Sequence, residues 1–239
     1  MSYQDITQSA EFRAELASQR TFMARVYGWM TIGLLITALG ALVVAGNQNL
    51  VRALILQRGV LIAAILLQLG IAMAFGFLQR FLAPPVAGAL FLLYSAITGV
   101  TLGAIILLVY TSASVVSTFV ITAGMFGAMS VWGITTKRDL TSLGSFMFMG
   151  LIGLVLAGIV SMFFGGPSPL LHFVICIVGV IVFTGLTAYD TQKIARSYAD
   201  GEAGSAIYRK SAIYGAFTLY LDFINLFLYL LQLLGSRRD

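Results

Sequence analysis

The feature that most constrains the fold of this sequence is a series of seven apolar runs, each about as long as a bilayer-spanning helix. Such a helix needs about 20 predominantly apolar residues. The runs cover residues 26–46, 59–79, 86–110, 113–134, 143–164, 170–189 and 212–234. None shows the alternation that is typical of a transmembrane β-strand. The sequence therefore predicts an all-α integral membrane protein with about seven transmembrane helices.

Composition and charge point to the same class. Hydrophobic residues make up 59% of the chain and charged residues 10%, whereas a soluble domain carries roughly 25% charged residues. The net charge of +5 comes from Lys and Arg residues placed in ones and twos between the apolar runs. This pattern is typical of membrane-flanking charge, so we expect the lipid bilayer as partner and no nucleic acid. Cys176 is the single cysteine, and its apolar surroundings predict a small buried residue.

The domain organisation is predicted to be simple. Residues 1–25 are polar and do not resemble a signal peptide, so we expect a cytoplasmic N-terminal segment followed by one transmembrane domain over residues 26–239. With the N-terminus inside, ten Lys and Arg residues fall on the inner side and four on the outer side. The positive-inside rule then predicts a cytoplasmic N-terminus. Seven spans would place the C-terminus outside.

Glycines inside the runs predict close helix packing, because small residues allow backbones to approach in lipid. We prefer this interpretation to one in which they act as hinges. The pairs concerned are Gly99 and Gly103, Gly124 and Gly127, and Gly150 and Gly153.

Asp222 breaks the apolar pattern in the middle of the last run. A carboxylate there costs several kcal/mol unless it is protonated, paired or hydrated. Polar residues of this run fall on one helical face, within an arc of about 80°; they are Ser211, Tyr214, Thr218, Asp222, Asn225, Tyr229 and Gln232. The stripe serves either as polar contact between helices or as a water-accessible path. In the second case Thr218, Asn225 and Tyr229 are the pore-lining candidates.

Asp190, at the end of the sixth run, lies at a similar predicted depth. Helix rise places Asp222 about 10 Å inside the cytoplasmic boundary, and Asp190 about one turn inside it. Depth permits a pair without proving contact. Two carboxylates in a desolvated site cannot easily both ionise, so they share a proton. Ionisation would separate them and attract a hard cation, which predicts a pH sensor, a gate and a transient Ca²⁺ site.

Two further residues bear on this site. Arg80, at the cytoplasmic end of the second run, is either a counter-charge for the acids or a topology signal. His172, near the outer end of the sixth run, lies about 27 Å along the helix from Asp190, so we interpret it as interfacial. In the loop before the fifth run, Asp139 or Thr141 is a candidate helix cap.

Several segments resemble the Bax inhibitor-1 (TMBIM, YccA-like) family, in particular its bacterial branch. They are Tyr189–Ile194, Leu219–Phe227, Phe22–Met30 and Lys137–Leu140. The resemblance covers essentially the whole chain. It implies two three-helix layers around a central C-terminal helix, in a bacterial inner membrane.

The resemblance also implies a function. It implies a pH-sensitive calcium leak gated by an aspartate pair and an arginine, whose positions match Asp190, Asp222 and Arg80. Some family members carry a glutamate in the second helix, where this chain has Gln68, and the difference implies weaker or absent conduction.

Three functional classes follow. The first is a pH-sensitive cation leak channel, with Ca²⁺ as the expected ion. The second is a regulatory membrane protein that binds a partner such as a membrane-anchored protease through residues 1–25. The third, an enzyme, is not expected, and neither is a cofactor. Tyr189-Asp190 supplies one half of an intramembrane aspartyl-protease pattern, and the Gly-x-Gly-Asp half is missing around Asp222.

Overall fold

The computed structural model describes residues 3–47, 58–78, 81–163, 166–197 and 205–236. These residues form seven helices: α1 (Tyr3–Ala45), α3 (Arg58–Leu78), α4 (Pro84–Val109), α5 (Ser112–Thr135), α6 (Thr141–Phe163), α7 (Pro169–Arg196) and α8 (Ala206–Leu234). Within this described part of the chain, six helices are long and apolar enough to cross a membrane. The apolar part of α3, Ile62–Phe77, is shorter.

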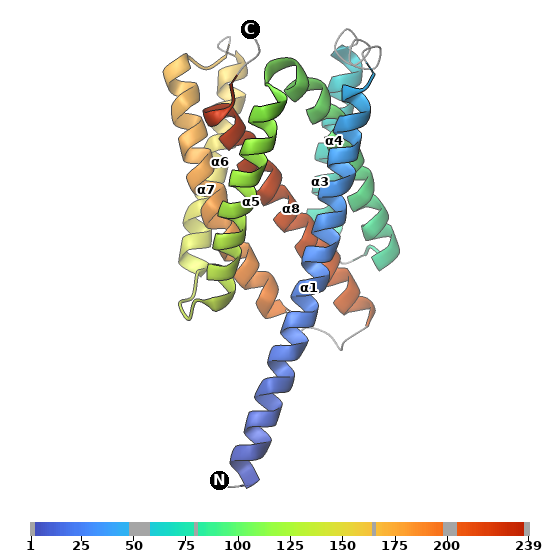
Figure 1. Ribbon diagram of the computed structural model, residues 1–239, viewed down its shortest axis with the longest axis vertical. Helices are drawn as coiled ribbons and strands as arrows, with labels where there is room; N and C mark the ends of the chain where they lie inside the picture. Colours follow the sequence, from blue (N-terminus) through green and yellow to red (C-terminus); the bar gives the residue numbers. More distant parts are fainter. Residues whose placement is uncertain (1–2, 48–57, 79–80, 164–165, 198–204, 237–239) are drawn as a thin grey trace.

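The helices form two layers with α8 between them (Figure 1). One layer contains α1, α3 and α4, and the other contains α5, α6 and α7. Helix α8 crosses the bundle and packs against α1, α4, α5 and α7. It also contributes many of the most deeply buried side chains, among them Leu219, Tyr220 and Leu226. The expectation of two three-helix layers around a central C-terminal helix is therefore confirmed.

Helix starts carry the expected capping residues. The side chains of Thr111, Ser168 and Ser205 accept backbone N–H groups in the first turns of α5, α7 and α8. These bonds satisfy donors that a helix start leaves without an intrahelical partner. The short connections therefore fix where each helix enters the bundle.

Helix α1 extends well beyond the membrane-spanning run. It is continuous from Tyr3 to Ala45, and its N-terminal part projects past the other helices (Figure 1). Contact with the bundle is established by Gln19, whose side chain donates to the Ala195 carbonyl at 3.0 Å, and by the buried Phe22. We call this end of the molecule the α1 end; the C-terminus lies at the opposite end.

The prediction that glycines allow close helix packing holds at three of the six positions. Gly99 and Gly103 lie against the α1 backbone at Thr37 and Ala41, and Gly150 lies 2.8 Å from Val182 when a Cβ is placed on it. For these three, close packing is confirmed. Gly124, Gly127 and Gly153 have open space where a Cβ would stand, so packing does not explain them.

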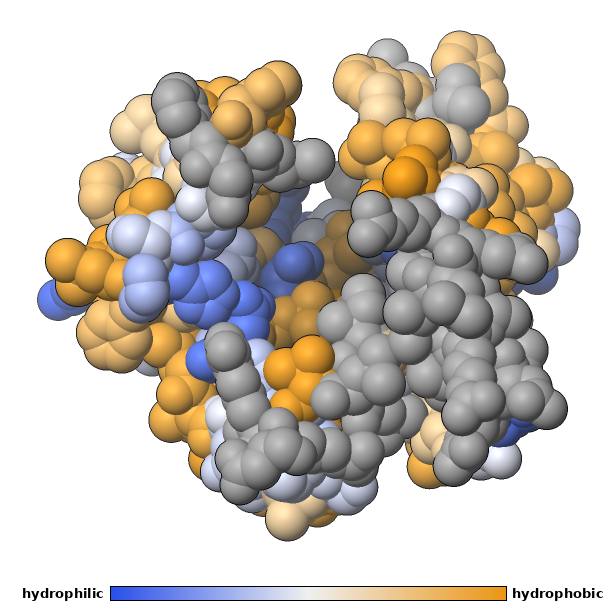
Figure 2. Space-filling view, turned by 90° about the horizontal axis from the view of Figure 1, so that it is seen from above, coloured by the Kyte–Doolittle hydropathy of each residue, from blue (hydrophilic) through white to orange (hydrophobic). Residues whose placement is uncertain are grey.

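Large apolar side chains cover the outside of the bundle. Examples are Leu42, Phe77 and Phe163, which are 66%, 77% and 84% exposed. Figure 2, which looks onto the end opposite the α1 end, shows hydrophobic residues, in orange, around much of the periphery and a notch between two lobes on one side. A surface of this kind is stable against lipid rather than water.

Candidate functional site

The structure brings the two predicted acids together. Asp190 lies in the last turns of α7, and Asp222 lies in the middle of α8, where it is 4% exposed. Their carboxyl groups lie close enough to interact directly. Because ionised carboxylates only accept hydrogen bonds, a hydrogen bond between them requires a proton on one of the two groups.

The burial of Asp222 reinforces the need for that proton. Its second oxygen, Oδ2, is buried and has no hydrogen-bond partner among the described residues. A buried charged oxygen without a partner is costly in an apolar bundle. The geometry therefore favours a carboxyl pair that shares a proton over two separate carboxylates.

Close packing fixes the position of α7 beside Asp190. Gly133 of α5 lies directly against the Ala188 backbone, and Gly144 of α6 lies under the Tyr189 ring. A Cβ at either glycine would overlap these atoms. Two neighbouring helices thus approach α7 within two residues of the acid and leave it little freedom to rotate.

The acid pair lines a cavity of about 940 Å³ between α3, α6, α7 and α8. The cavity lies in the half of the bundle near the α1 end. Its walls mix apolar and polar groups and include Phe75, Gly76, Phe148, Leu151, Tyr189, Asp190, Lys193, Lys210, Ser211, Tyr214, Thr218, Asp222 and Asn225.

The polar stripe of the last helix divides between two environments. Thr218 and Asn225 line the cavity; that they line a pore stays a prediction. Tyr229 is absent from the lining; its ring packs on Gly179 and stacks on Phe183 with centroids 5.8 Å apart. Farther along, Gln232 contacts His172 at 3.0 Å. The stripe is therefore continuous in sequence, whereas the cavity ends near Asn225.

His172 stays far from the acids, at the other end of α7. Its Nε2 contacts the Gln232 carbonyl oxygen, and Cys176 Sγ lies 3.8 Å from its Nδ1. Cys176 is 1% exposed, as expected for a small buried residue. These contacts join the start of α7 to the end of α8.

Among the predicted residues, Arg80 lies outside the described part of the chain, so its role as counter-charge stays a prediction. Gln68 donates to the hydroxyl groups of Thr98 and Thr101 at 3.1 and 3.2 Å. It thus joins α3 to α4 and is not part of the cavity lining.

Sequence reasoning missed the two lysines of the site. Lys193 and Lys210 both line the cavity. The signal was present for Lys193, because it follows Asp190 by three residues and so shares its helical face. Its Nζ lies 5.7 Å from the centroid of the Tyr189 ring, a distance suited to a cation–π contact.

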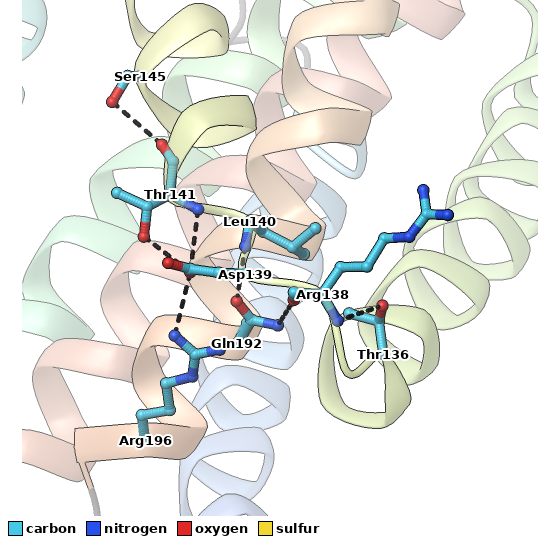
Figure 3. Close-up of polar contacts among 8 residues, drawn as sticks. All are labelled: Thr136, Arg138, Asp139, Leu140, Thr141, Ser145, Gln192 and Arg196. Carbon is cyan, nitrogen blue, oxygen red and sulfur yellow. Dashed lines mark hydrogen bonds and ion pairs between the residues drawn. The ribbon is translucent and has the colours of Figure 1, made fainter.

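A second polar cluster, the α7 latch, joins the end of α7 to the loop before α6 (Figure 3). The Gln192 side chain accepts from the Leu140 N–H at 3.0 Å and donates to the Arg138 carbonyl at 2.9 Å. Arg196 pairs with Asp139 at 3.1 Å. The latch therefore ties the segment of α7 that carries Asp190 to the loop before α6.

Asp139 and Thr141 interact at the start of α6, although neither holds the N-cap position predicted for them, because α6 begins at Thr141 and Leu140 precedes it. Its Oδ1 accepts from the Thr141 hydroxyl at 2.8 Å and from the Thr141 N–H at 3.2 Å. These two bonds, and then the Arg196 guanidinium, hold the pKa of the Asp139 carboxyl below its usual range.

Comparison with known proteins gives the family. A family model described as "Inhibitor of apoptosis-promoting Bax1" matches residues 19–239. The chain belongs to the Bax inhibitor-1 family. The match covers all the described helices apart from the projecting part of α1.

Bacterial relatives of this Bax inhibitor-1 protein match over nearly their full length. "Inner membrane protein YbhL" of Escherichia coli (strain K12) is 49% identical over 224 residues, which cover 93% of this chain and 94% of the relative. An uncharacterized protein of Borreliella burgdorferi is 45% identical over 236 residues, covering 98% and 99%. Together with the six long apolar helices, these matches support a multi-pass inner membrane protein.

Proposed function

We propose that this protein is a pH-sensitive leak pathway for cations, with Ca²⁺ as the permeant ion, gated by Asp190 and Asp222. The observation that carries the proposal is the carboxyl pair itself. Two acids from different helices meet in the wall of a cavity, inside a bundle whose core is mainly apolar. Ionisable groups at this depth mark ion or proton pathways in membrane proteins.

The pair can work as a gate because its two protonation states have opposite effects. With one shared proton, the carboxyl groups attract each other and hold α7 against α8. Loss of that proton leaves two negative charges in a poorly solvated site, where their repulsion is strong. Rising pH therefore separates the helices.

The same ionisation attracts a hard cation. Ca²⁺ takes six to eight oxygen ligands, and Thr218 and Asn225 line the same cavity as the two carboxyl groups. Protein oxygens and water together could supply a transient site. Among the described residues no group of three or more His, Cys, Asp or Glu side chains gathers to hold a metal, which suits passage better than storage.

The described conformation corresponds to the closed state of this pathway. Beyond Asn225, the side chains of Phe227, Leu230 and Leu231 on α8 are buried against the neighbouring helices. An ion that enters the cavity would therefore require α7 and α8 to separate before it could continue. Because Gln68 is neutral and bonded to α4, we expect slower conduction than in relatives with an acid in this helix.

The test is Ca²⁺ entry into dye-loaded proteoliposomes between pH 5.5 and 8.5. We expect flux to rise with pH in the native protein. In Asp222→Asn and Asp190→Asn the flux should lose its pH dependence, because the pair can no longer acquire a second charge. Asp139→Asn is the matched control, since this acid lies outside the cavity. Absence of flux above that of empty liposomes, with the protein folded and inserted, would refute the channel.

One observation favours a second function, partner binding. The N-terminal part of α1 projects beyond the bundle (Figure 1), and a projecting helix is available for a partner such as a membrane-anchored protease. Deleting residues 2–14 removes this projection and leaves the Gln19 contact with α7. Unchanged Ca²⁺ flux with lost co-purification of a protease would favour this function; reduced flux with retained co-purification would argue against it.

A further inference from the structure

The cavity is larger and more aromatic than the passage of an ion requires. Its volume is about 940 Å³, and pockets for small organic ligands usually enclose about 300–1,000 Å³. Ca²⁺ prefers oxygen ligands, so an apolar wall offers it little. The lining nevertheless includes the rings of Phe75, Phe148, Phe183 and Phe217. The size and the lining therefore suit an organic molecule.

Helices α3 and α8 together build the aromatic part of the wall. Phe75 of α3 stacks on Phe217 of α8 with ring centroids 4.2 Å apart, and it meets the Tyr214 ring edge to face at 5.0 Å. Phe75 and Phe217 are 2% and 4% exposed, so their neighbours fix their positions. A preorganised apolar surface can hold the hydrocarbon part of a ligand with little loss of protein entropy.

Two buried polar atoms of the lining residues have no hydrogen-bond partner among the residues that the structure describes. They are Oδ2 of Asp222 and the hydroxyl oxygen of Tyr214. An unsatisfied buried polar group is costly, so each of these atoms would gain from a ligand that bonds to it. The two residues are about 12 Å apart along α8. A ligand that reaches both is therefore elongated.

The acid pair favours a ligand with one positive charge. When Asp190 and Asp222 share one proton, the pair carries a single negative charge, which one ammonium group neutralises. An alkylammonium side chain already lines this cavity. The Nζ of Lys193 lies 5.7 Å from the centroid of the Tyr189 ring, and its charge acts on Asp190. The wall therefore accommodates an ammonium group close to an aromatic ring and an acid.

We propose that this cavity binds an amphipathic organic amine, with its ammonium group on the pair of Asp190 and Asp222 and its apolar body along Phe75 and Phe217. A primary ammonium group has three donors, and the carboxyl oxygens accept them. Binding of this kind does not require the protein to conduct ions. If the proposed leak function holds, a bound amine should also reduce Ca²⁺ entry, because its ammonium group occupies the acids.

The test is equilibrium binding of tritiated 4-phenylbutylammonium to the purified protein in detergent at neutral pH. This probe has one positive charge and an elongated apolar body. We expect saturable binding, and we expect the unlabelled amine to displace the probe at least about tenfold better than 4-phenylbutanol. The alcohol has a similar shape but no charge, and hydrogen bonds between charged partners exceed neutral ones by about this factor.

Two glycines of α3 locate the binding site. Gly76 lines the cavity, and a Cβ placed on it meets nothing within 4 Å. Gly76→Leu should therefore fold normally, fill part of the cavity and weaken binding at least about fivefold, the lower end of the cost of overpacking. Gly70 has the same open space but does not line the cavity. Gly70→Leu is thus the matched control and should bind as the native protein does.

A double variant removes the charge of the acid pair. Asp190→Asn combined with Asp222→Asn should abolish the preference for the amine over the alcohol. Thermal unfolding of the variant without ligand verifies that it is folded. The comparison of amine with alcohol on the native protein tests the same point without any substitution.

Three results would overturn the proposal. Equal displacement by the amine and the alcohol would show that the acids do not recognise the charge. Equal affinities of Gly76→Leu and Gly70→Leu would place the probe outside the cavity, and absence of saturable binding to the folded protein would exclude a site. None of these measurements records ion flux, so a protein that fails the Ca²⁺ test still gives a decisive answer on amine binding.

Discussion

At the scale of single residues, Asp139 and Asp222 show how environment separates two acids of one chain. Asp222 is buried with one oxygen unpartnered. Asp139 is exposed, and its carboxylate receives bonds from Thr141 and Arg196. The first arrangement favours a bound proton, and the second favours the charge.

Asp139 supports a prediction about acid stability. Its pKa is held below the usual range, chiefly by the Thr141 hydroxyl and N–H. A carboxyl with a lowered pKa stabilises the fold above its unfolded pKa of about 4, and this contribution is lost as pH falls through the lower folded value. Thermal unfolding midpoints of the native protein and Asp139→Asn should therefore run parallel above pH 5 and converge below about pH 4. Divergence between pH 5.5 and 8.5 would contradict this assignment.

The sequence predicted the acid pair but not its full surroundings. Helix rise and membrane thickness place Asp190 and Asp222 at similar depths, which permitted a pair but did not prove contact. Tyr229 lies on the same helical face as Asn225, but the cavity ends before it. Helical periodicity gives the face of a residue and not the position of the neighbouring helix, so it could not exclude Tyr229.

At the scale of elements, the position of α7 is set by contacts from both neighbours in its layer. The glycines at Gly133 and Gly144 admit the Ala188 backbone and the Tyr189 ring. The α7 latch adds the hydrogen bonds of Gln192. Motif spacing could not reveal the latch, because its partners are separated by more than 50 residues and meet only where α7 runs back to the loop before α6.

Two glycines of α5 offer a matched pair of substitutions. Gly133→Ala places a methyl group against the Ala188 backbone, and overpacking of this kind costs about 1–3 kcal/mol. Gly124→Ala enters open space, so it should gain about 1 kcal/mol from helix propensity. Unfolding midpoints in detergent should therefore shift in opposite directions. Equal shifts would show that the contact at Gly133 does not limit the approach of α5 and α7.

At the scale of the whole molecule, the two termini lie at opposite ends of the bundle (Figure 1). This agrees with an odd number of crossings, and the distribution of Lys and Arg predicts a cytoplasmic N-terminus. The layered arrangement around α8 followed from the resemblance, whereas the apolar runs alone gave only the number and length of the helices.

Reporter fusions test the predicted orientation. Alkaline phosphatase, which is active only outside the cytoplasm, should be active when fused after residue 239 and inactive when fused in the loop at residue 138. Fluorescent protein fusions at the same two positions should give the reverse pattern. Activity of the phosphatase at residue 138 would invert the topology and place the cavity mouth on the outer side.

The central claim is that the shared proton of Asp190 and Asp222 controls the pathway. The most direct measurement is infrared difference spectroscopy of the carboxylic acid C=O band during a pH titration, with Ca²⁺ flux recorded on the same preparation. We predict that the native protein shows a carboxylic acid band that Asp222→Asn lacks. This band should disappear as pH rises, with a midpoint that coincides with the rise in flux. A band that persists through the pH range in which flux changes would contradict the account.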